Sequence, residues 1–309
     1  MTLPHPTGPF RGYARAMQKQ TLRLIFIHLL VLTVFLTGTS QSALVVAFVA
    51  FIWRGIFLTL SYHRYFSHRS FKTSRFVQFL LAAGGSICMQ RGALWWAANH
   101  RLHHQFSDTD KDPHSPLAHG FWHAHMGWAM ERKSFETDYS RIRDFEAFPE
   151  LKWLNEHSDA VHFVFALLLF AGGEILRIKS PALGANGWQF LVWGYLISGL
   201  LHLHTIFLVN SWGHLYGDRP YSFPAREGKD NSHNNRWLAW LTFGEGWHYN
   251  HHCFPASAKI GLKAGEFDGG WLLLKILEKS GLIWDLNVPD SKTVASLTPK
   301  SQAVGVSKN

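Results

Sequence analysis

The sequence predicts an all-α membrane protein with four transmembrane helices in two hairpins and a cytosolic helical cap that carries a cluster of histidines. Three features predict it: four apolar runs that fall into two pairs, a long polar segment between the pairs, and an excess of histidine and aromatic residues. The 309 residues include 20 His, 14 Trp and 24 Phe, while only 17% are charged. This balance is typical of a membrane protein with a polar functional face.

The apolar runs are separated within each pair by short turns. Residues 39–42 form an uncharged turn in the first pair, and residues 180–187 form a break rich in turn residues in the second. Each run approaches the roughly 20 residues that a spanning helix requires. The four predicted spans cover residues 24–38, 43–60, 161–176 and 188–209.

Two shorter apolar segments and the C-terminal tail complete the predicted organisation. Residues 76–89 contain two glycines and are predicted to form an interfacial or re-entrant helix, and residues 272–277 an amphipathic one. We expect residues 1–289 to form a single integral-membrane domain. Residues 290–309 are rich in Ser, Thr, Lys and Val and are predicted to be disordered.

The net charge of +9 indicates a membrane surface rather than a nucleic acid, because Arg11, Arg15, Lys19 and Arg23 lie beside an apolar run. Two hairpins return the chain to one side, so residues 63–158 and 210–309 would share a compartment with both termini. The positive-inside tendency makes this compartment the cytoplasm, and the membrane the inner one if the chain is bacterial. The lipid bilayer is therefore an expected partner, and nucleic acid is not.

Histidine is concentrated in three short clusters and at one further position. The clusters read HRYFSH, HRLHH and HYNHH, and the further histidine follows the fourth apolar run. The two cysteines, Cys88 and Cys253, provide neither a disulfide framework nor a cysteine-rich zinc pattern, so imidazole must hold any metal. The nine candidate ligands are His63, His68, His100, His103, His104, His214, His248, His251 and His252.

The spacing within the clusters predicts convergence. Residues three or four apart share a helix face, so His100, His103 and His104 are expected to point at one spot, as are the three histidines of the third cluster. Nine imidazoles exceed the needs of one tetrahedral zinc and suit two metal ions with open or water-filled positions. Neutral imidazole binds iron, copper, nickel and zinc, so ligand type alone does not select iron.

The other histidines are predicted to be structural. The three histidines of the segment HGFWHAH are expected to pack or to form hydrogen bonds. The two near the end of the fourth apolar run, His202 and His204, are expected to form hydrogen bonds between helices or to contact the metal ligands from behind. The others are structural or incidental. Imidazole ligands usually donate their second N–H to a carboxylate, and five carboxylates lie near the clusters in sequence. The structural histidines are His5, His28, His119, His123, His125, His162, His202 and His204; the carboxylates are Asp108, Asp110, Asp112, Asp218 and Glu245.

The clusters resemble those of the membrane fatty acyl desaturases of the stearoyl-CoA desaturase type. That family has one His-x4-His box, two His-x2-His-His boxes, and an Asn-x3-His motif after the fourth span, matched here by Asn210 and His214. The tetrapeptides DPHS at 112–115 and EGWH at 245–248 also look like the family. The similarity runs from about residue 53 to about residue 255.

The resemblance implies a four-span helical fold whose cap holds two non-haem irons. The nine histidines would ligate them, and Asn210 would contact one iron through water. It implies insertion of a cis double bond, commonly at the ninth carbon, with O2 and two electrons from an external ferredoxin or cytochrome b5 and its reductase. A metal centre is needed because acid–base and nucleophilic side chains cannot attack an unactivated methylene.

The acyl carrier stays open. Animal acyl-CoA members place Arg-Asp before the second box, whereas this chain has Ala98-Asn99, so CoA, a lipid or an acyl carrier protein could carry the chain. No His-Pro-Gly-Gly haem motif indicates a fused cytochrome b5. Four tryptophans next to the boxes are candidate walls of a narrow acyl tunnel, with core packing or interface anchoring as the alternative for each. They are Trp95, Trp96, Trp212 and Trp247.

Three other functions compete with a desaturase. A related histidine-box membrane hydroxylase would share the site but yield an alcohol. A membrane haem electron carrier would use His28, His162, His202 and His204 as axial ligands. A non-enzymatic metal-binding membrane protein would show no turnover with any reductase.

Overall fold

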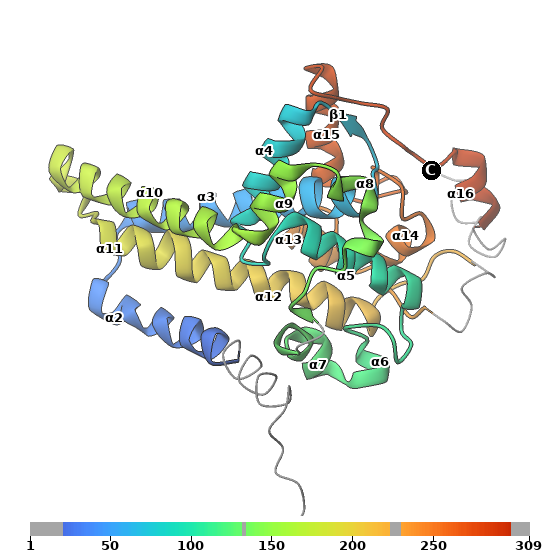
Figure 1. Cartoon of the computed structure of the whole chain (residues 1–309), viewed down its shortest axis with the longest axis horizontal. Helices are drawn as coiled ribbons and strands as arrows, with labels where there is room; N and C mark the ends of the chain where they lie inside the picture. The colour runs from blue at the N-terminus through green and yellow to red at the C-terminus, as the bar shows by residue number, and fades with distance from the viewer. Residues whose placement is uncertain (1–20, 132–133, 223–229, 298–309) are drawn as a thin grey trace, which may run out of the picture.

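The computed structural model describes residues 21–131, 134–222 and 230–297. His5 and the basic residues Arg11, Arg15 and Lys19 lie outside this part of the chain. The described part is mostly helical. Long helices pack side by side as an arm, and shorter helices gather at one end of the arm as a cap (Figure 1).

Three helices in the described residues are long and apolar enough to cross a membrane. They match the second, third and fourth predicted spans. The first predicted span is helical too, but its described length, Thr21–Thr37, is shorter than the other three. The first long helix, Gln41–Ser67, consists of α3 (Gln41–Phe57) and η2 (Leu58–Ser67), and the second is α10 (Ser158–Lys179). The third, Gly187–His214, consists of α11 (Gly187–Gln189), η7 (Phe190–Ile197), α12 (Ser198–Ser211) and η8 (Trp212–His214). The short helix ends with η1 (Val31–Thr33) and α2 (Val34–Thr37).

The predicted turns start the two longest helices. Ser40 caps α3 by accepting a hydrogen bond from Ala43 N–H at 3.2 Å, and Asn186 caps α11 by accepting one from Gln189 N–H at 2.9 Å. These side chains satisfy N–H groups that have no partner within the helix. Each of these two helices therefore begins at one of the predicted turns.

Helix length explains how the ligands leave the membrane. The helices Gln41–Ser67 and Gly187–His214 have 27 and 28 residues, which corresponds to roughly 40 Å at 1.5 Å per residue. The hydrocarbon core is only about 30 Å thick. If both helices enter the membrane at the turns, as predicted, their C-terminal ends would extend past it; these ends carry His63, Asn210 and His214 into the cap.

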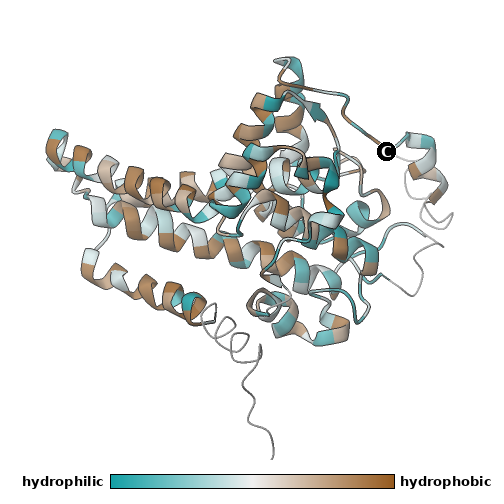
Figure 2. Cartoon of the chain, viewed as in Figure 1, coloured by the Kyte–Doolittle hydropathy of each residue, from teal (hydrophilic) through white to brown (hydrophobic). Residues whose placement is uncertain are grey.

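The surface of the arm is apolar, as a lipid environment requires (Figure 2). Leu44, Phe48, Phe163, Leu168 and Ile178 of α3 and α10 are all exposed. The bilayer core contains no water that could form hydrogen bonds with polar groups at these positions. The exposed side chains thus mark the lipid-facing sides of the predicted spans.

One charge is buried inside the arm. Arg54 of α3 is completely buried and donates to the carbonyl oxygens of Ile87 at 2.9 Å, and of Gly194 and Tyr195 at 3.3 Å. It also donates to the Ser198 hydroxyl. A charged residue within a span is costly unless it finds such partners. Arg54 therefore ties α3 to η7 and the start of α12.

The cap surrounds a core of aromatic and aliphatic side chains, including Tyr62, Phe66, Leu94, Phe145 and Leu274. The predicted helix at 76–89 is α4, and the predicted amphipathic helix is longer than expected, as α15. Two short strands pair antiparallel, with Lys72 opposite Trp284. The main cap elements are β1 (Lys72–Thr73), α4 (Arg75–Ser86), α5 (Ala93–Phe106), α6 (Pro116–His119), α7 (Phe121–His125), α8 (Arg143–Glu146), α9 (Pro149–Glu156), α13 (Arg236–Leu241), α14 (His248–Cys253), α15 (Gly269–Lys279) and β2 (Ile283–Trp284).

The C-terminal segment differs in part from the prediction. Residues 291–297, expected to lack structure, form helix α16, Ser291–Leu297. The C-terminal end of this helix contacts the segment that follows the last long helix, because Ser222 N–H donates to Leu297 O at 2.8 Å. Residues 298–309 lie outside the described residues.

Candidate metal centre

The nine predicted ligands gather into two adjacent groups in the cap. The five-histidine group and the four-histidine group each place one nitrogen per ring within 4.8 Å of every other in the group. The groups touch, since the rings of His104 and His252 stack with their centroids 4.4 Å apart. The five-histidine group is His63, His68, His100, His104 and His251, and the four-histidine group is His103, His214, His248 and His252.

The structure corrects one expectation about the boxes. Each His-x2-His-His box was expected to point at one spot, but each is divided between the groups. His100 and His104 join the five-histidine group, whereas His103 joins the other. Neighbouring residues on a helix differ by about 100° in direction, so adjacent histidines face different groups. Residues four apart stay together, as His248 and His252 also do.

The second box is held in place by neighbouring polar and aromatic side chains. Arg101 of α5 donates to Ser67 O at 2.9 Å and to Asp144 at 2.9 Å, which fixes α5 against the end of η2. Trp96 stacks on His100 with ring centroids 4.7 Å apart. These contacts leave His100 little freedom to turn away from the site.

The ring nitrogens are spaced as ligands of single ions would be. In the five-histidine group the successive Nε2···Nε2 distances are 2.8–3.0 Å. In the four-histidine group two such distances are 2.8 and 3.3 Å. Neighbouring nitrogens bound at about 2.0–2.1 Å would be separated by roughly 2.9–3.4 Å. Each group therefore fits one ion with imidazole ligands.

The far side of four rings faces carboxylates. Nδ1 of His103, His214 and His252 lies 2.9, 2.8 and 2.9 Å from Asp112, Asp108 and Asp230, respectively, and His63 Nδ1 contacts Glu245. An Nδ1–H that donates to a carboxylate leaves a lone pair on Nε2 of the neutral ring. These lone pairs point at one another within each group. Lone pairs this close repel one another, and a cation bound between them would remove the repulsion by accepting them as ligands. The residues therefore fit a metal.

The three aspartates are ionised. Burial alone would raise their pKa values, but hydrogen bonds and charges of the neighbouring histidines outweigh it and hold the pKa of Asp108, Asp112 and Asp230 below the usual range. Burial also lowers the pKa of His248, which keeps its ring neutral. A divalent ion that binds Nε2 would replace the second proton of such a ring, and the carboxylate behind the ring would stabilise the bound cation.

The carboxylate predictions were partly right. Asp108, Asp112 and Glu245 contact the histidines, while Asp218 forms a backbone bridge with Asn234 and Asp110 is exposed in a turn. Sequence reasoning missed Asp230, which lies 22 residues before His252. No motif at Asp230 signals its role, because the contact depends on how the segment before α13 folds back onto His252.

A small cavity of about 20 Å³ lies between the two groups. It is lined by His63 and His100 of one group, by His103 and His248 of the other, and by Asn210. About 10–15 Å³ suffices for one water molecule with polar partners. The position of Asn210 thus allows it to hold a water beside both groups.

The four predicted tunnel tryptophans lie in different places. Trp96 lines the cavity between the groups, and Trp95 lines a separate pocket. Trp212 is exposed and packs against Tyr216, and Trp247 is buried and donates to Phe267 O at 2.8 Å. Trp95 and Trp96 are therefore the two that face open space near the histidines.

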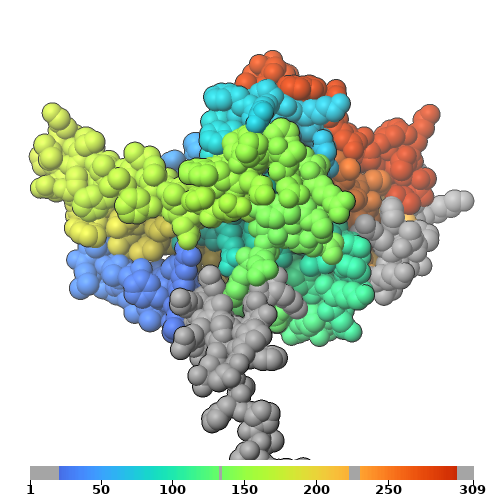
Figure 3. Space-filling model, in the orientation of Figure 1, coloured from blue at the N-terminus to red at the C-terminus, as the bar shows by residue number. Residues whose placement is uncertain are grey.

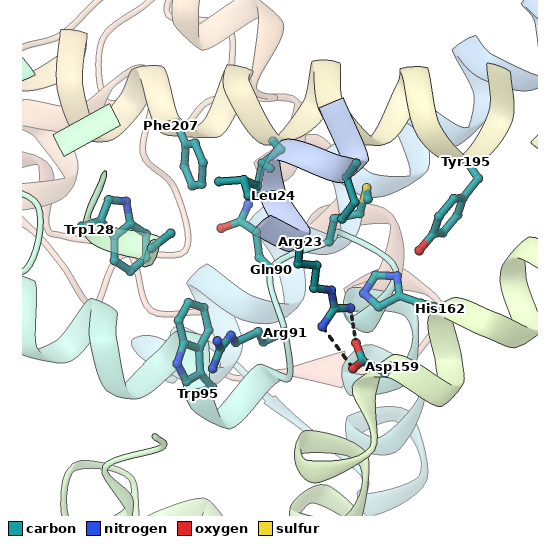
Figure 4. Close-up of a pocket in the computed structure, with 14 residues that line it drawn as sticks. Arg23, Leu24, Gln90, Arg91, Trp95, Trp128, Asp159, His162, Tyr195 and Phe207 are labelled. Atoms are coloured by element: carbon teal, nitrogen blue, oxygen red, sulfur yellow. Dashed lines mark hydrogen bonds and ion pairs between the residues drawn. The ribbon is translucent and has the colours of Figure 1, made fainter. Parts of the chain in front are cut away.

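The pocket beside Trp95 has a volume of about 130 Å³ and lies between the N-terminal helix, α10 and α12 (Figure 4). Leu24, Leu203 and Phe207 make part of it apolar. An ion pair at its edge, Arg23 to Asp159 at 2.7 Å, links the N-terminal helix to α10. In the space-filling view, α10 runs along the arm and meets the cap at one end (Figure 3).

Five of the seven predicted structural histidines in the described part of the chain form hydrogen bonds; the exceptions are His162, whose Nδ1 has no partner there, and His202. His119 and His123 contact the carbonyl oxygens of Asp112 and Pro113, each at 3.1 Å. His204 contacts both His28 and His125 at 3.0 Å and so joins three helices. His202 was expected to do likewise, but it is buried in an apolar environment with no hydrogen-bond partner among the described residues.

The predicted haem ligands do not form an axial pair. Nε2 of His28 and Nε2 of His204 are 3.0 Å apart. Two axial imidazoles must be separated by about 4 Å, twice a metal–nitrogen bond of about 2.0 Å. His28 and His204 are hydrogen-bonded to each other, so the geometry does not favour a haem carrier.

Comparison with known proteins decides the family. The fatty acid desaturase family model matches residues 40–259. The chain belongs to the fatty acid desaturase family. This desaturase is 34% identical over 273 residues to the sn-1 stearoyl-lipid 9-desaturase of Synechocystis, covering 87% of this chain and 80% of the relative. The sn-1 stearoyl-lipid 9-desaturase of Anabaena variabilis is 34% identical, with 88% and 94% covered. The acyl-CoA C20 Delta5-desaturase of Anemone leveillei is 35% identical, with 84% and 78% covered.

Proposed function

We propose that this desaturase inserts a cis double bond at the ninth carbon of a saturated acyl chain, using O2 and two electrons at a non-haem di-iron centre. The observation that carries the proposal is the pair of adjacent histidine groups with their Nε2 lone pairs facing inward. The ninth carbon rests on the stearoyl-lipid 9-desaturases named above, to which the chain is similar over most of its length.

Two irons would be held by the five-histidine and four-histidine groups. When bound, they supply the O2-derived oxidant that an unactivated methylene requires. The protein residues orient the metal ligands and enclose the site. Asp108, Asp112, Asp230 and Glu245 fix the ring tautomers, and Asn210 would hold a water between the groups.

The acyl chain would pass from the pocket at Trp95 to the cavity at Trp96. Gln90 lines the pocket and accepts a hydrogen bond from Trp96 Nε1 at 2.8 Å, so this pair forms the wall between the two spaces. A narrow aromatic passage would hold one methylene pair beside the irons. Trp212 and Trp247 line neither of these spaces.

Four spans in two hairpins would place the cap in the cytoplasm. The three long helices and Thr21–Thr37 would be these spans. Convergence of the histidines supports the arrangement, because residues after the second and the fourth span reach the same site. A cytoplasmic site is accessible to ferredoxin or cytochrome b5, which would supply the electrons.

The test is lipid analysis of a host that expresses the chain with a competent electron donor. We expect new cis-monounsaturated acids with the double bond at carbon nine, located by mass spectrometry of derivatised esters. Feeding labelled acyl-CoA and labelled glycerolipid to membranes identifies the carrier. Hydroxylated products in place of alkenes, from membrane-inserted and iron-loaded protein, would overturn the proposal in favour of a hydroxylase.

Replacing Asn210 tests the proposed water. We expect Asn210→Leu to lower turnover by about 10-fold or more, because an apolar side chain fills the cavity and cannot hold a water. Both irons should remain, because no described histidine depends on Asn210 for a hydrogen bond. The measurement is turnover beside iron content by mass spectrometry; unchanged turnover would remove Asn210 from the site.

A further inference from the structure

The two histidine groups differ in what stands behind their rings. In the four-histidine group, three of four rings face an aspartate through Nδ1 at 2.8 or 2.9 Å. In the five-histidine group, His63 has such a partner, Glu245. A carboxylate behind an imidazole fixes its tautomer and raises its basicity, and loss of such a partner typically costs 10- to 100-fold in metal affinity.

The carboxylates are also unequal in the charge they can offer. Glu245 shares its charge with Arg64, whose Nε lies 3.9 Å away, and accepts a hydrogen bond from the Thr59 hydroxyl. Asp108 accepts its further hydrogen bonds from neutral donors, Asn231 N–H at 2.7 Å and Ser115 Oγ–H at 2.9 Å. Arg64 is also paired with Asp268 at 2.6 Å, so the main difference is one of number: one carboxylate stands behind the five-histidine group and three behind the other.

Metal binding by two rings of the five-histidine group carries an additional free-energy cost. A neutral imidazole that ligates through Nε2 carries its proton on Nδ1. Nδ1 of His104 and Nδ1 of His251 are buried and have no hydrogen-bond partner in the described part of the chain. An N–H group buried without an acceptor destabilises the bound state. This opposes the advantage of a fifth nitrogen ligand.

We propose that the four-histidine group is the tighter of the two metal sites, and that Asp230 is a positioning residue that sets its affinity by fixing His252. The inference rests on the proposed function only in that both groups bind iron. It predicts that iron leaves the two sites in separate steps when a chelator competes for it. The five-histidine group loses its iron first.

The experiment uses the iron-loaded full-length protein in lipid nanodiscs, exposed to increasing EDTA, with bound iron counted by mass spectrometry. We expect two steps of one iron each. His104→Ala should keep the step at high EDTA, and His214→Ala should keep only the step at low EDTA. Asp230→Asn should lower the EDTA concentration at which the second iron leaves by about 10- to 100-fold, while the concentration at which the first iron leaves stays unchanged.

Asp110→Asn is the matched control, because Asp110 belongs to the same set of nearby aspartates but is exposed; both steps should be unchanged. The unchanged low step in Asp230→Asn separates positioning from general unfolding. Loss of both irons in one step, loss of the high step in His104→Ala, or no shift in Asp230→Asn would each overturn the inference, even in an active desaturase. A protein that binds no iron in either group would instead overturn the proposed function.

Discussion

Alanine at His248 or at His251 should abolish desaturation. These neighbours on α14 serve different groups, His248 in the four-histidine group and His251 in the other. Each substitution removes a ligand outright, so we expect turnover to fall by well over the roughly 100-fold that follows loss of a ligand's hydrogen-bond partner. Turnover and iron content, measured on membranes with equal amounts of protein, check this.

The control is His157→Ala. His157 is exposed and stacks on Trp153, far in the fold from both groups, so this variant should retain full turnover and two irons. If either α14 variant remained active with both irons bound, the assignment of that histidine as a ligand would be wrong.

Alanine at Gly246 should destabilise the whole cap. A Cβ at this position would lie 2.1 Å from Ala239 N and 2.6 Å from Asn235 O. Both are backbone atoms, so no side-chain rotation can relieve the overlap. Overpacking usually costs 1–3 kcal/mol, and we expect about 3 kcal/mol or more because α13 itself must move. The midpoint of thermal denaturation in detergent should fall by several degrees, with loss of iron.

Gly172→Ala provides the comparison, because a Cβ there meets no atom within 4 Å and alanine favours a helix. It should leave the midpoint unchanged or slightly raised. Equal midpoints for Gly246→Ala and the native protein would show that α13 and the third box are not packed as described.

Sequence periodicity and box spacing predicted most of the site because the chemistry is local. All nine histidines lie in short motifs that could be read directly from the sequence. The division of the rings between the two groups could not be predicted, since His103 and His104 are neighbours in sequence but differ by about 100° in direction about the helix axis. Asp230 was missed for the same kind of reason: its partner His252 is set by tertiary folding.

Helix boundaries and lone polar residues within spans were also hard to predict. The helix after the first turn continues as far as Ser67, through residues that are polar and carry the first box. Hydropathy alone ends it near residue 60. His202 shows the opposite limit, because a polar residue in an apolar run suggests a hydrogen bond, yet packing left it without one among the described residues.

The buried Arg54 has a consequence for biogenesis. Its acceptors Gly194 and Ser198 follow it by 140 and 144 residues, so they are synthesised well after α3 has reached the membrane. An arginine at the centre of an inserting helix costs about 2.5–3.5 kcal/mol. Until the last span enters the bilayer, the Ile87 carbonyl, 33 residues after Arg54, is the acceptor already synthesised, and water or lipid phosphate must complete the solvation of the guanidinium. In the proposed arrangement of two hairpins, the first hairpin can therefore insert early, but it reaches its final depth and packing only when synthesis of the last span is complete.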